Sequence, residues 1–206
     1  MSYKTPTIPS LTLKGIDKKI QDIQEKMSGL TWLDKSFGLA DRFVKQKKEA
    51  EYIYPGVFES NTIDPIDVMP SDIYPSMSFW VKTPSGMIEE TEDFPPKNPV
   101  MTYKVSCIFY IDIRRIDNTL TWKETKSKLR EDILYFFATV QFNGRLTRTA
   151  IIDDDITLVY AGFSLEQIDN IYKEYPKWTC RVDFELSYYE HRTPDECYVA
   201  NTYTIS

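Results

Sequence analysis

The sequence is poor in the residue types on which many enzymes depend. Its 206 residues include one histidine, His191, and three cysteines, Cys107, Cys180 and Cys197. A single histidine removes most mechanisms that use a histidine-containing triad or histidine metal ligands. The cysteines are too few and too scattered for a disulfide framework or a zinc site. Cys107 and Cys180 fall on apolar strand faces, where cysteine acts as a small hydrophobe.

Glycine and long apolar runs are scarce as well. Only seven glycines are present, and none forms a Gly-x-Gly-x-x-Gly motif, a phosphate loop or a nucleophile elbow. No apolar run approaches the roughly 20 residues that cross a bilayer, and the N-terminus lacks the apolar core of a secretory signal. We therefore expect no membrane contact, no cofactor and no metal. We also expect a protein that stays in the cytoplasm unless it is assembled into something exported.

The composition is otherwise that of an ordinary globular protein. Hydrophobic residues make up 42% and charged residues 27%, and the enrichment in aromatic residues is largely due to tyrosine. The formal net charge of −6 is uneven, because residues 1–50 hold ten basic and six acidic residues while the remainder holds 15 and 25. Residues 51–206 are thus net acidic, whereas a sequence-specific nucleic-acid binder normally shows a concentrated group of basic residues.

The stretch from Pro99 to Gln141 carries the clearest pattern. Apolar side chains occupy every second position from Met101 to Ile113, with mostly polar ones between them, which predicts a strand with one buried face. Thr121 and Glu124 then form a capping-box signature ahead of a helix with one apolar side. The apolar positions of this helix are Leu129, Ile133, Phe136, Phe137 and Val140.

Similar patterns predict the remaining elements. Apolar residues at helical spacing indicate one helix over residues 16–29 and a second over 34–51. Ser164 with Gln167 indicates a third, short helix. Alternation predicts strands at 77–81, 146–152, 156–160 and 178–188.

Together these elements predict an α+β fold in which an antiparallel sheet packs against one main amphipathic helix, with N-terminal helices and extended arms. Residues 1–50 are expected to form an N-terminal arm and helices. Residues 51–206 are expected to form an α+β domain with proline-rich loops and a C-terminal tail. The strands at 77–81 and 101–113 are expected to pair as an antiparallel hairpin, whose acidic tip spans residues 83–98.

Prolines and chain ends point to contacts with other subunits. Eight of the twelve prolines lie between Pro55 and Pro99, so residues 55–75 are expected to be irregular. Long loops and terminal arms cost entropy unless neighbouring chains hold them. The stripe that begins at Ile16 either packs on the protein's own sheet or docks on a neighbouring subunit. The residues expected at subunit interfaces are Ile16, Ile20, Ile23, Met27, Tyr52, Tyr54, Phe58, Tyr74, Tyr198 and Tyr203.

Two groups of acidic residues are candidates for a metal site or an acid–base pair. The run Asp153–Asp155 could gather Mg²⁺ or Ca²⁺, but it lacks the spacing of an EF-hand, and aspartates are ordinary turn residues, so we favour a turn. Asp183 and Glu185 share one strand face and could act as an acid–base pair. The wet face of an antiparallel sheet explains these two residues equally well.

A third group resembles half of a nuclease site. Glu124, Thr125 and Lys126 form the acid-x-lysine pair of a restriction-type nuclease signature, with Asp112 or Asp117 as the upstream acid. That signature needs the pair on a strand, where alternation directs both side chains at one metal. Here the pair is expected in the first turn of a helix, so we do not expect it to be catalytic.

The order of elements resembles a group of phage proteins. An N-terminal helix, a hairpin with an acidic tip and a long strand leading into an amphipathic helix are followed by the strand Trp178-Thr-Cys-Arg-Val-Asp-Phe-Glu-Leu-Ser-Tyr-Tyr189. Over residues 76–189 this order resembles the tail-terminator or tail-completion proteins of tailed bacteriophages. It is also similar to the neck-ring proteins of crAss-like phages.

The resemblance implies a non-enzymatic structural subunit of a closed homo-oligomeric ring at the head–tail junction of the virion, assembled in the cytoplasm of the host bacterium. Neighbouring portal, neck and tail proteins would be its partners. Genome DNA would pass through without specific binding, which suits an acidic body because phosphate contacts provide non-specific affinity. The alternatives are a metal-dependent nuclease or another small phage or bacterial enzyme, and a monomeric adaptor that binds one host protein.

Overall fold

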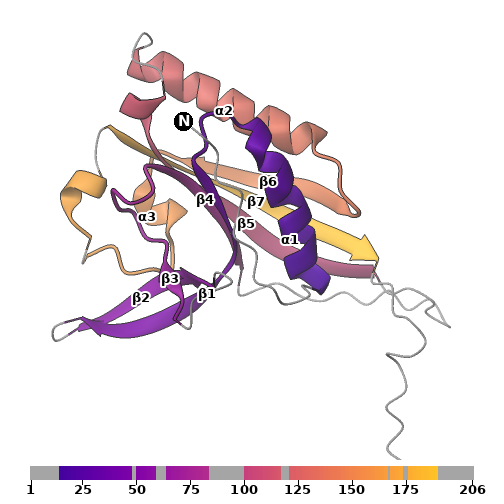
Figure 1. Cartoon of the computed structure of the whole chain (residues 1–206), viewed down its shortest axis with the longest axis horizontal. Helices are drawn as coiled ribbons and strands as arrows, with labels where there is room; N and C mark the ends of the chain where they lie inside the picture. Colours follow the sequence, from indigo (N-terminus) through magenta and orange to yellow (C-terminus); the bar gives the residue numbers. More distant parts are fainter. Residues whose placement is uncertain are drawn as a thin grey trace, which may run out of the picture.

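One mixed sheet organises the chain. The computed structural model describes residues 14–47, 50–58, 64–83, 100–116, 121–166, 168–173 and 176–189. Its seven strands lie in the order β3-β2-β1-β4-β5-β7-β6 (Figure 1). Every neighbouring pair is antiparallel except β1 and β4, which run parallel. The strands are β1 (Lys35–Lys47), β2 (Ala50–Val57), β3 (Ile66–Asp67), β4 (Ser76–Lys82), β5 (Val100–Asp112), β6 (Arg145–Asp153) and β7 (Lys177–Tyr189).

The two long helices lie on the same face of this sheet. α1 (Gly15–Lys26) and α2 (Trp122–Thr139) run across the front of the strands in Figure 1. The opposite face is covered in part by loops, by the short helix α3 (Ile156–Val159) and by the 3₁₀ turn η3 (Asn170–Tyr172). Two further 3₁₀ turns are η1 (Met27–Gly29) and η2 (Ile113–Arg115).

The expected fold class is therefore wrong. The sheet is mixed rather than antiparallel, because the chain leaves β1 through β2 and β3 and only then reaches β4, which runs in the same direction as β1. Two helices share the covered face, so the sheet does not pack against one main helix. Of the expected N-terminal helices only α1 forms, and the division expected between residues 50 and 51 falls inside the β1–β2 hairpin.

The false prediction of a helix over 34–51 has an identifiable cause. The pairing of β1 with β4 shifts register between Ser36 and Leu39. Because of this irregularity Phe37 and Ala40, three residues apart, both lie in the core on the loop-covered face, while Leu39 packs on the other face. An irregular strand thus reproduces the three-residue spacing of a helix, and the apolar pattern alone cannot separate the two.

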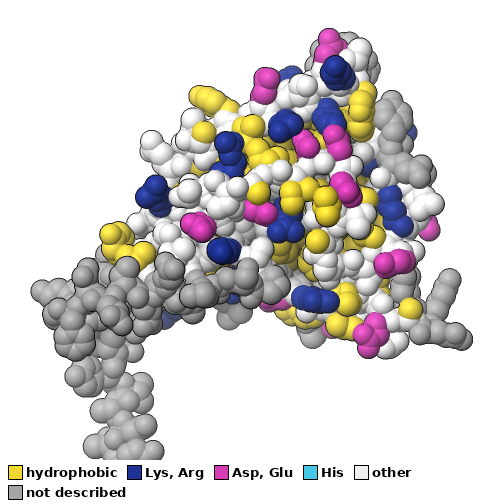
Figure 2. All heavy atoms as spheres, turned by 180° about the vertical axis from the view of Figure 1, so that it is seen from behind, with side chains coloured by type: hydrophobic (Ala, Val, Ile, Leu, Met, Phe, Trp, Pro, Cys, Tyr) yellow, Lys and Arg dark blue, Asp and Glu magenta, His cyan; other side chains and the backbone are white. Residues whose placement is uncertain are grey.

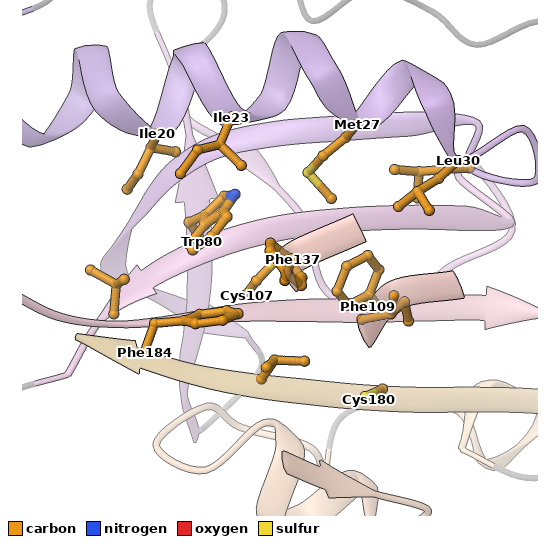
Figure 3. Packing of buried hydrophobic residues seen from close by; sticks show 14 of the residues in the cluster. Ile20, Ile23, Met27, Leu30, Trp80, Cys107, Phe109, Phe137, Cys180 and Phe184 are labelled. Atoms are coloured by element: carbon orange, nitrogen blue, oxygen red, sulfur yellow. The ribbon is translucent and has the colours of Figure 1, made fainter. Parts of the chain in front are cut away.

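The helix-covered core contains the stripe of α1. Ile20, Ile23 and Met27 are completely buried over Trp80 and Phe184 of the sheet (Figure 3). The stripe therefore packs on the protein's own sheet, as in the first of the two alternatives. α2 contributes Leu129, Ile133 and Phe137 to the same core.

The elements with the cleanest patterns are confirmed. β5 and β7 pair along their whole length, β4 pairs with β5 as the expected hairpin, and β6 covers the strand expected at 146–152. α2 begins with the expected capping box, in which the Glu124 amide donates to Thr121 Oγ1 at 3.4 Å and the Thr121 amide donates to Glu124 Oε2 at 2.9 Å. The hairpin tip and both terminal arms lie largely outside the described residues.

The loop-covered core corrects two further predictions. Residues 156–160 are not a strand, because Asp155 caps α3 by accepting from the amides of Thr157 at 2.9 Å and Leu158 at 3.3 Å. Ser164 caps no helix within the described part of the chain, and Gln167 lies outside it. The Ser164 hydroxyl accepts from the amide of Ile53 at 3.0 Å, and its amide donates to the carbonyl of Ile53 at 2.8 Å.

The proline-rich stretch over residues 55–75 is more ordered than expected. Pro55 lies within β2, opposite Arg42 of β1, and its carbonyl accepts from the amide of Val68 at 3.0 Å. Residues 66–67 form β3 against Gly56 and Val57.

No helix among the described residues is long and apolar enough to cross a membrane.

Candidate functional site

Among the described residues, a concentrated group of charges lies at one end of β5 and β7. Asp112 closes β5 directly opposite Lys177, the first residue of β7. Lys177 Nζ donates to Asp112 Oδ2 at 2.7 Å, and the two side chains are only 4% and 3% exposed. Burying a single charge at this depth is costly, so each residue depends on the other.

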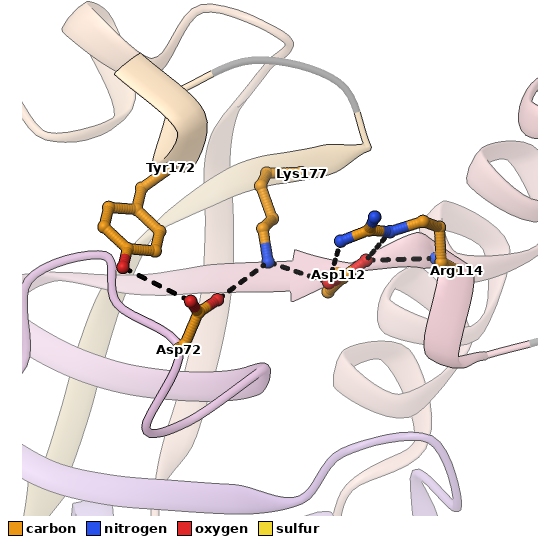
Figure 4. Close-up of polar contacts among 5 residues, drawn as sticks. All are labelled: Asp72, Asp112, Arg114, Tyr172 and Lys177. Atoms are coloured by element: carbon orange, nitrogen blue, oxygen red, sulfur yellow. Dashed lines mark hydrogen bonds and ion pairs between the residues drawn. The ribbon is translucent and has the colours of Figure 1, made fainter. Parts of the chain in front are cut away.

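Three more side chains complete this group, which we term the Lys177 cluster (Figure 4). Arg114, from η2, donates to Asp112 with its guanidinium and its amide, and Asp72, from the loop before β4, lies 3.5 Å from Lys177 Nζ. Tyr172 of η3 donates to Asp72 Oδ2 at 3.3 Å. The cluster therefore ties two loops to the end of the sheet, with two carboxylates balancing two cations.

Hydrogen bonds within the cluster use all the acceptor positions of the Asp112 carboxylate. Oδ1 accepts from the amide and Nε of Arg114, both at 3.2 Å, and Oδ2 accepts from Arg114 Nη2 at 3.0 Å and from Lys177 Nζ. Burial alone would raise the pKa of Asp112, but the hydrogen bonds from Arg114 and Lys177 outweigh it and lower the pKa. With four bonds accepted, this carboxylate has no position left for a metal or a substrate proton.

Two tyrosines of the loop-covered core have buried hydroxyl groups, and one of them, Tyr110, lies with its ring centre 5.9 Å from Lys177 Nζ. Tyr110 and Tyr160 are completely buried, and neither hydroxyl has a hydrogen-bond partner among the described residues. Burial raises the pKa of both phenols, and for Tyr110 the nearby carboxylates Asp112 and Asp72 raise it further. These groups stay protonated at neutral pH and are not candidates for a phenolate base.

The nuclease-like residues have separate partners. Glu124 is occupied in the capping box, and Lys126 forms an ion pair with Asp154. Asp112 belongs to the Lys177 cluster, and Asp117 lies outside the described residues. The structure does not bring these side chains together around one position.

The aspartate run is used to close a turn. Asp153 pairs with Arg130 of α2 at 3.2 Å, Asp154 adopts a left-handed backbone conformation with φ 67°, and Asp155 caps α3. Among the described residues, no three His, Cys, Asp or Glu side chains are grouped so as to hold a metal ion. The run thus connects β6 to α3, whereas the expected turn was one that joins two strands.

Asp183 and Glu185 lie on the face of β7 opposite the long helices. Asp183 accepts from Ser106 Oγ and from Arg181 Nε, each at 2.6 Å. Glu185 lies between Lys104 of β5 and Thr147 of β6 in the strand register. This is a ladder of cross-strand polar pairs, which stabilises a sheet face that is partly open to water.

The two described cysteines are structural. Cys107 and Cys180 are buried in the helix-covered core, and both thiols are free. Burial raises the pKa of both thiols, and the carboxylate of Asp153 adds to the effect at Cys180. A buried, protonated thiol is a poor nucleophile.

The residues expected at interfaces divide into three groups. Ile16, Ile20, Ile23 and Met27 are at most 5% exposed, so they lie inside the protein rather than on its surface. The sheet of the same chain covers this stripe, so these four side chains are not exposed to a partner in the described structure.

Among Phe58 and the described tyrosines of this set, only Phe58 is clearly accessible, at 44% exposure. Tyr52 and Tyr54 are buried beneath the ammonium group of Lys45, which lies 4.8 Å and 4.5 Å from their ring centres. Tyr74 packs edge-on against Phe37. Tyr198 and Tyr203 lie outside the described residues.

The surface behind the helices is chemically mixed. Figure 2 shows basic and acidic side chains interspersed over this face, with apolar patches between them and no region dominated by one sign. The large exposed apolar side chains belong to different elements, so they do not define one binding patch. They are Val44, Phe58, Ile73, Tyr135, Leu158 and Tyr189.

The clearest unsatisfied feature is a sheet edge. The two outer strands are β3, with two residues, and β6, with nine. Within the described part of the chain, no backbone hydrogen bond joins β6 to anything on the side away from β7. Residues 147–150 of β6 are exposed. We term this side of β6 the β6 edge; it is a row of peptide groups available for another strand.

Sequence reasoning missed both the Lys177 cluster and the β6 edge. Asp112 and Lys177 are 65 residues apart, and only the register of β5 against β7 places them opposite each other. The signal that was present is a charged residue at the boundary of each alternating pattern. The position of β6 at the edge depends on strand order, which the local pattern of a strand does not contain.

Comparison of the chain with protein-family models, with curated proteins and with solved structures found no match.

Proposed function

We propose that the protein is a non-enzymatic structural subunit of a homo-oligomeric ring in the neck or tail of a tailed-phage virion. In this proposal the ring joins the head or portal to the tail and surrounds the path of the genome. The observation that carries the proposal is the β6 edge, because a long strand with no neighbour on one side among the described residues is a ready surface for contact with another chain. Repeated contacts of one surface with a different surface of the next copy close into a ring when the rotation permits.

The use of the acidic residues supports a structural role. Asp112, Glu124 and Asp155 each bond to groups of their own chain, as cluster member, capping-box residue and helix cap. Residues in these roles stabilise the fold, and they are not left available for a substrate. No specific observation favours the metal-dependent nuclease over the ring subunit.

The charge distribution supports passage of DNA without tight binding. The chain carries a formal net charge of −6, and the face in Figure 2 has no continuous basic strip. Non-specific DNA affinity comes mainly from lysine and arginine contacts to phosphates. A mixed, weakly acidic surface would let the duplex move past it.

The first test is the mass of the native assembly. Light scattering on the purified full chain, over about a hundredfold range of concentration, is expected to give a closed species that is an integer multiple of 24.2 kDa. A species of 24.2 kDa at every concentration would contradict the ring and favour the monomeric adaptor.

The second test is incubation with DNA and Mg²⁺. We expect no cleavage by the wild type or by the Glu124→Gln and Asp154→Asn variants. Cleavage that disappears in either variant would overturn the structural proposal in favour of a metal-dependent nuclease. Circular dichroism of each variant checks that the substitution leaves the fold intact.

A further inference from the structure

The β6 edge and the end of the chain are matched in length and in composition. β6 has nine residues, and the segment 197–205, CYVANTYTI, also has nine and contains neither proline nor glycine. Six of its residues are tyrosine, valine, threonine or isoleucine, the types that fit a strand best. The tail therefore has the chemistry of the strand that the edge lacks.

The charges on the two segments suggest a direction. β6 begins with Arg145 and carries Arg148, both exposed, whereas its end leads into Asp153 and Asp154. The tail has Asp195 and Glu196 immediately before the nine-residue segment. A tail that runs parallel to β6 places its acids beside the arginines, while the antiparallel direction would place them beside aspartates. Like charges at close range are unfavourable, so the parallel direction is preferred.

The local geometry favours the tail of another copy over the chain's own tail. β7 ends beside the start of β6, since Ser187 is paired with Arg145. The connection from α2 into β6 lies against that same end, where a Cβ on Gly144 would come within 3.0 Å of the Ser187 carbonyl oxygen. The chain's own tail would have to pass around this connection, and connections at one edge of a sheet rarely cross.

We propose that residues 197–205 of one copy add to the β6 edge of the next copy as a parallel eighth strand. This inference rests on the proposed homo-oligomer and names the contact that would hold it together. Main-chain hydrogen bonds supply the affinity, and the acidic residues before the tail strand pair with Arg145 and Arg148 to set its direction. Because edge and tail are different surfaces, each copy gives one strand and receives one, which is the arrangement of a closing ring.

The first experiment compares Ala200→Pro with Ala200→Thr in the full chain. Proline removes a main-chain donor and disfavours a ladder strand, whereas threonine favours one. We expect the dissociation constant of the assembly, measured by light scattering on dilution, to rise at least about tenfold for proline and to change little for threonine. An assembly that is equally stable with Ala200→Pro overturns the tail contact and leaves the proposed function standing. A wild type that is monomeric throughout contradicts both.

The second experiment locates the contact with disulfides. One copy carries Thr147→Cys with Cys197→Ser, and a differently tagged copy keeps Cys197. Under mild oxidation we expect a covalent dimer that contains both tags. The matched control is Ile152→Cys, which is expected to cross-link poorly. It lies about 13 Å further along β6 and on the same sheet face as Thr147, because the pairing of β6 with β7 shifts register between Arg148 and Ala150.

The outcomes of this experiment are distinct. A stronger cross-link at position 152 than at 147 would overturn the parallel direction. A disulfide that forms within single copies when Cys197 and Thr147→Cys are on one chain, with none between copies, would overturn the exchange between copies. The cross-link uses the thiol at Cys197, since Cys107 and Cys180 are buried.

Discussion

The two faces of the sheet are stabilised in different ways. The helix-covered face holds long apolar stripes from α1 and α2 against alternating residues of β5 and β7. The loop-covered face combines aromatic packing with position-specific polar contacts, including the Lys177 cluster and the pair of bonds between Ser164 and Ile53. Periodic apolar patterns thus account for one face, whereas the other depends on individual contacts between distant residues.

The largest expected effect comes from truncating the apolar core. Phe184→Ala removes a ring that is 2% exposed and that lies 4.7 Å from Phe137 and 5.9 Å from Trp80 between ring centres. We expect a loss of about 3–5 kcal/mol in the free energy of unfolding, because a cavity remains. Denaturant titration measures it.

The matched control is Phe58→Ala, at a side chain that is 44% exposed. Its truncation removes the same atoms from a site that water already reaches, so we expect less than about half of the loss seen at Phe184. Equal losses at the two positions would show that the helix-covered core is not the dominant source of stability.

The next effect concerns the ion cluster. Asp112→Ala leaves the Lys177 ammonium group buried with only the more distant Asp72 carboxylate, so we expect a loss of about 3 kcal/mol or more. Adding Lys177→Met to Asp112→Ala removes the stranded charge and should recover part of the loss. A double-mutant cycle that is simply additive would argue against a coupled pair.

The same cluster predicts a dependence on pH. The pKa of Asp112 is lowered in the folded protein from its ordinary value of 3.8, so its contribution is present above that value and is lost as pH falls through the folded pKa. Chemical unfolding between neutral pH and pH values below 3.8 should therefore show a smaller acid-dependent loss for Asp112→Ala than for the wild type. Identical slopes would remove Asp112 as a source of acid sensitivity.

The smallest effect separates satisfied from unsatisfied hydroxyl groups. Tyr160→Phe removes a buried hydroxyl with no partner among the described residues, so we expect unchanged or slightly increased stability, by less than about 1 kcal/mol. Tyr52→Phe removes a hydroxyl that bonds to Asp67 and should cost about 1 kcal/mol. Thermal unfolding of the two variants side by side tests the difference in sign.

Sequence patterns predicted the helix-covered face, whose elements have regularly spaced apolar residues. β5, β7 and the capping box of α2 follow from regular alternation and from one local signature, since each needs only neighbouring residues to be recognised. β1 was mistaken for a helix because its irregularity near Phe37 imitates helical spacing. Residues 156–160 were mistaken for a strand because the cap at Asp155 outweighs their strand propensity.

The candidate site was harder to predict than the fold. Asp112 was considered for chemistry, but its partner Lys177 was not, because the pair forms only when two distant strands align. Tyr172 and Asp72 join the cluster from loops whose positions depend on the completed sheet. Contacts of this kind have no local sequence signal.

The wide separation of contacting residues also bears on how the chain folds as it is synthesised. The Trp32 indole donates to Asp132 of α2 at 3.1 Å, 100 residues later, and β5 gains its neighbour β7 only when residues 177–189 have been made. The α1 stripe is therefore translated well before the strands that bury it. It emerges from the ribosome as an exposed hydrophobic segment. Such a nascent chain is a natural client for chaperones that shield apolar surface until the last strand is complete.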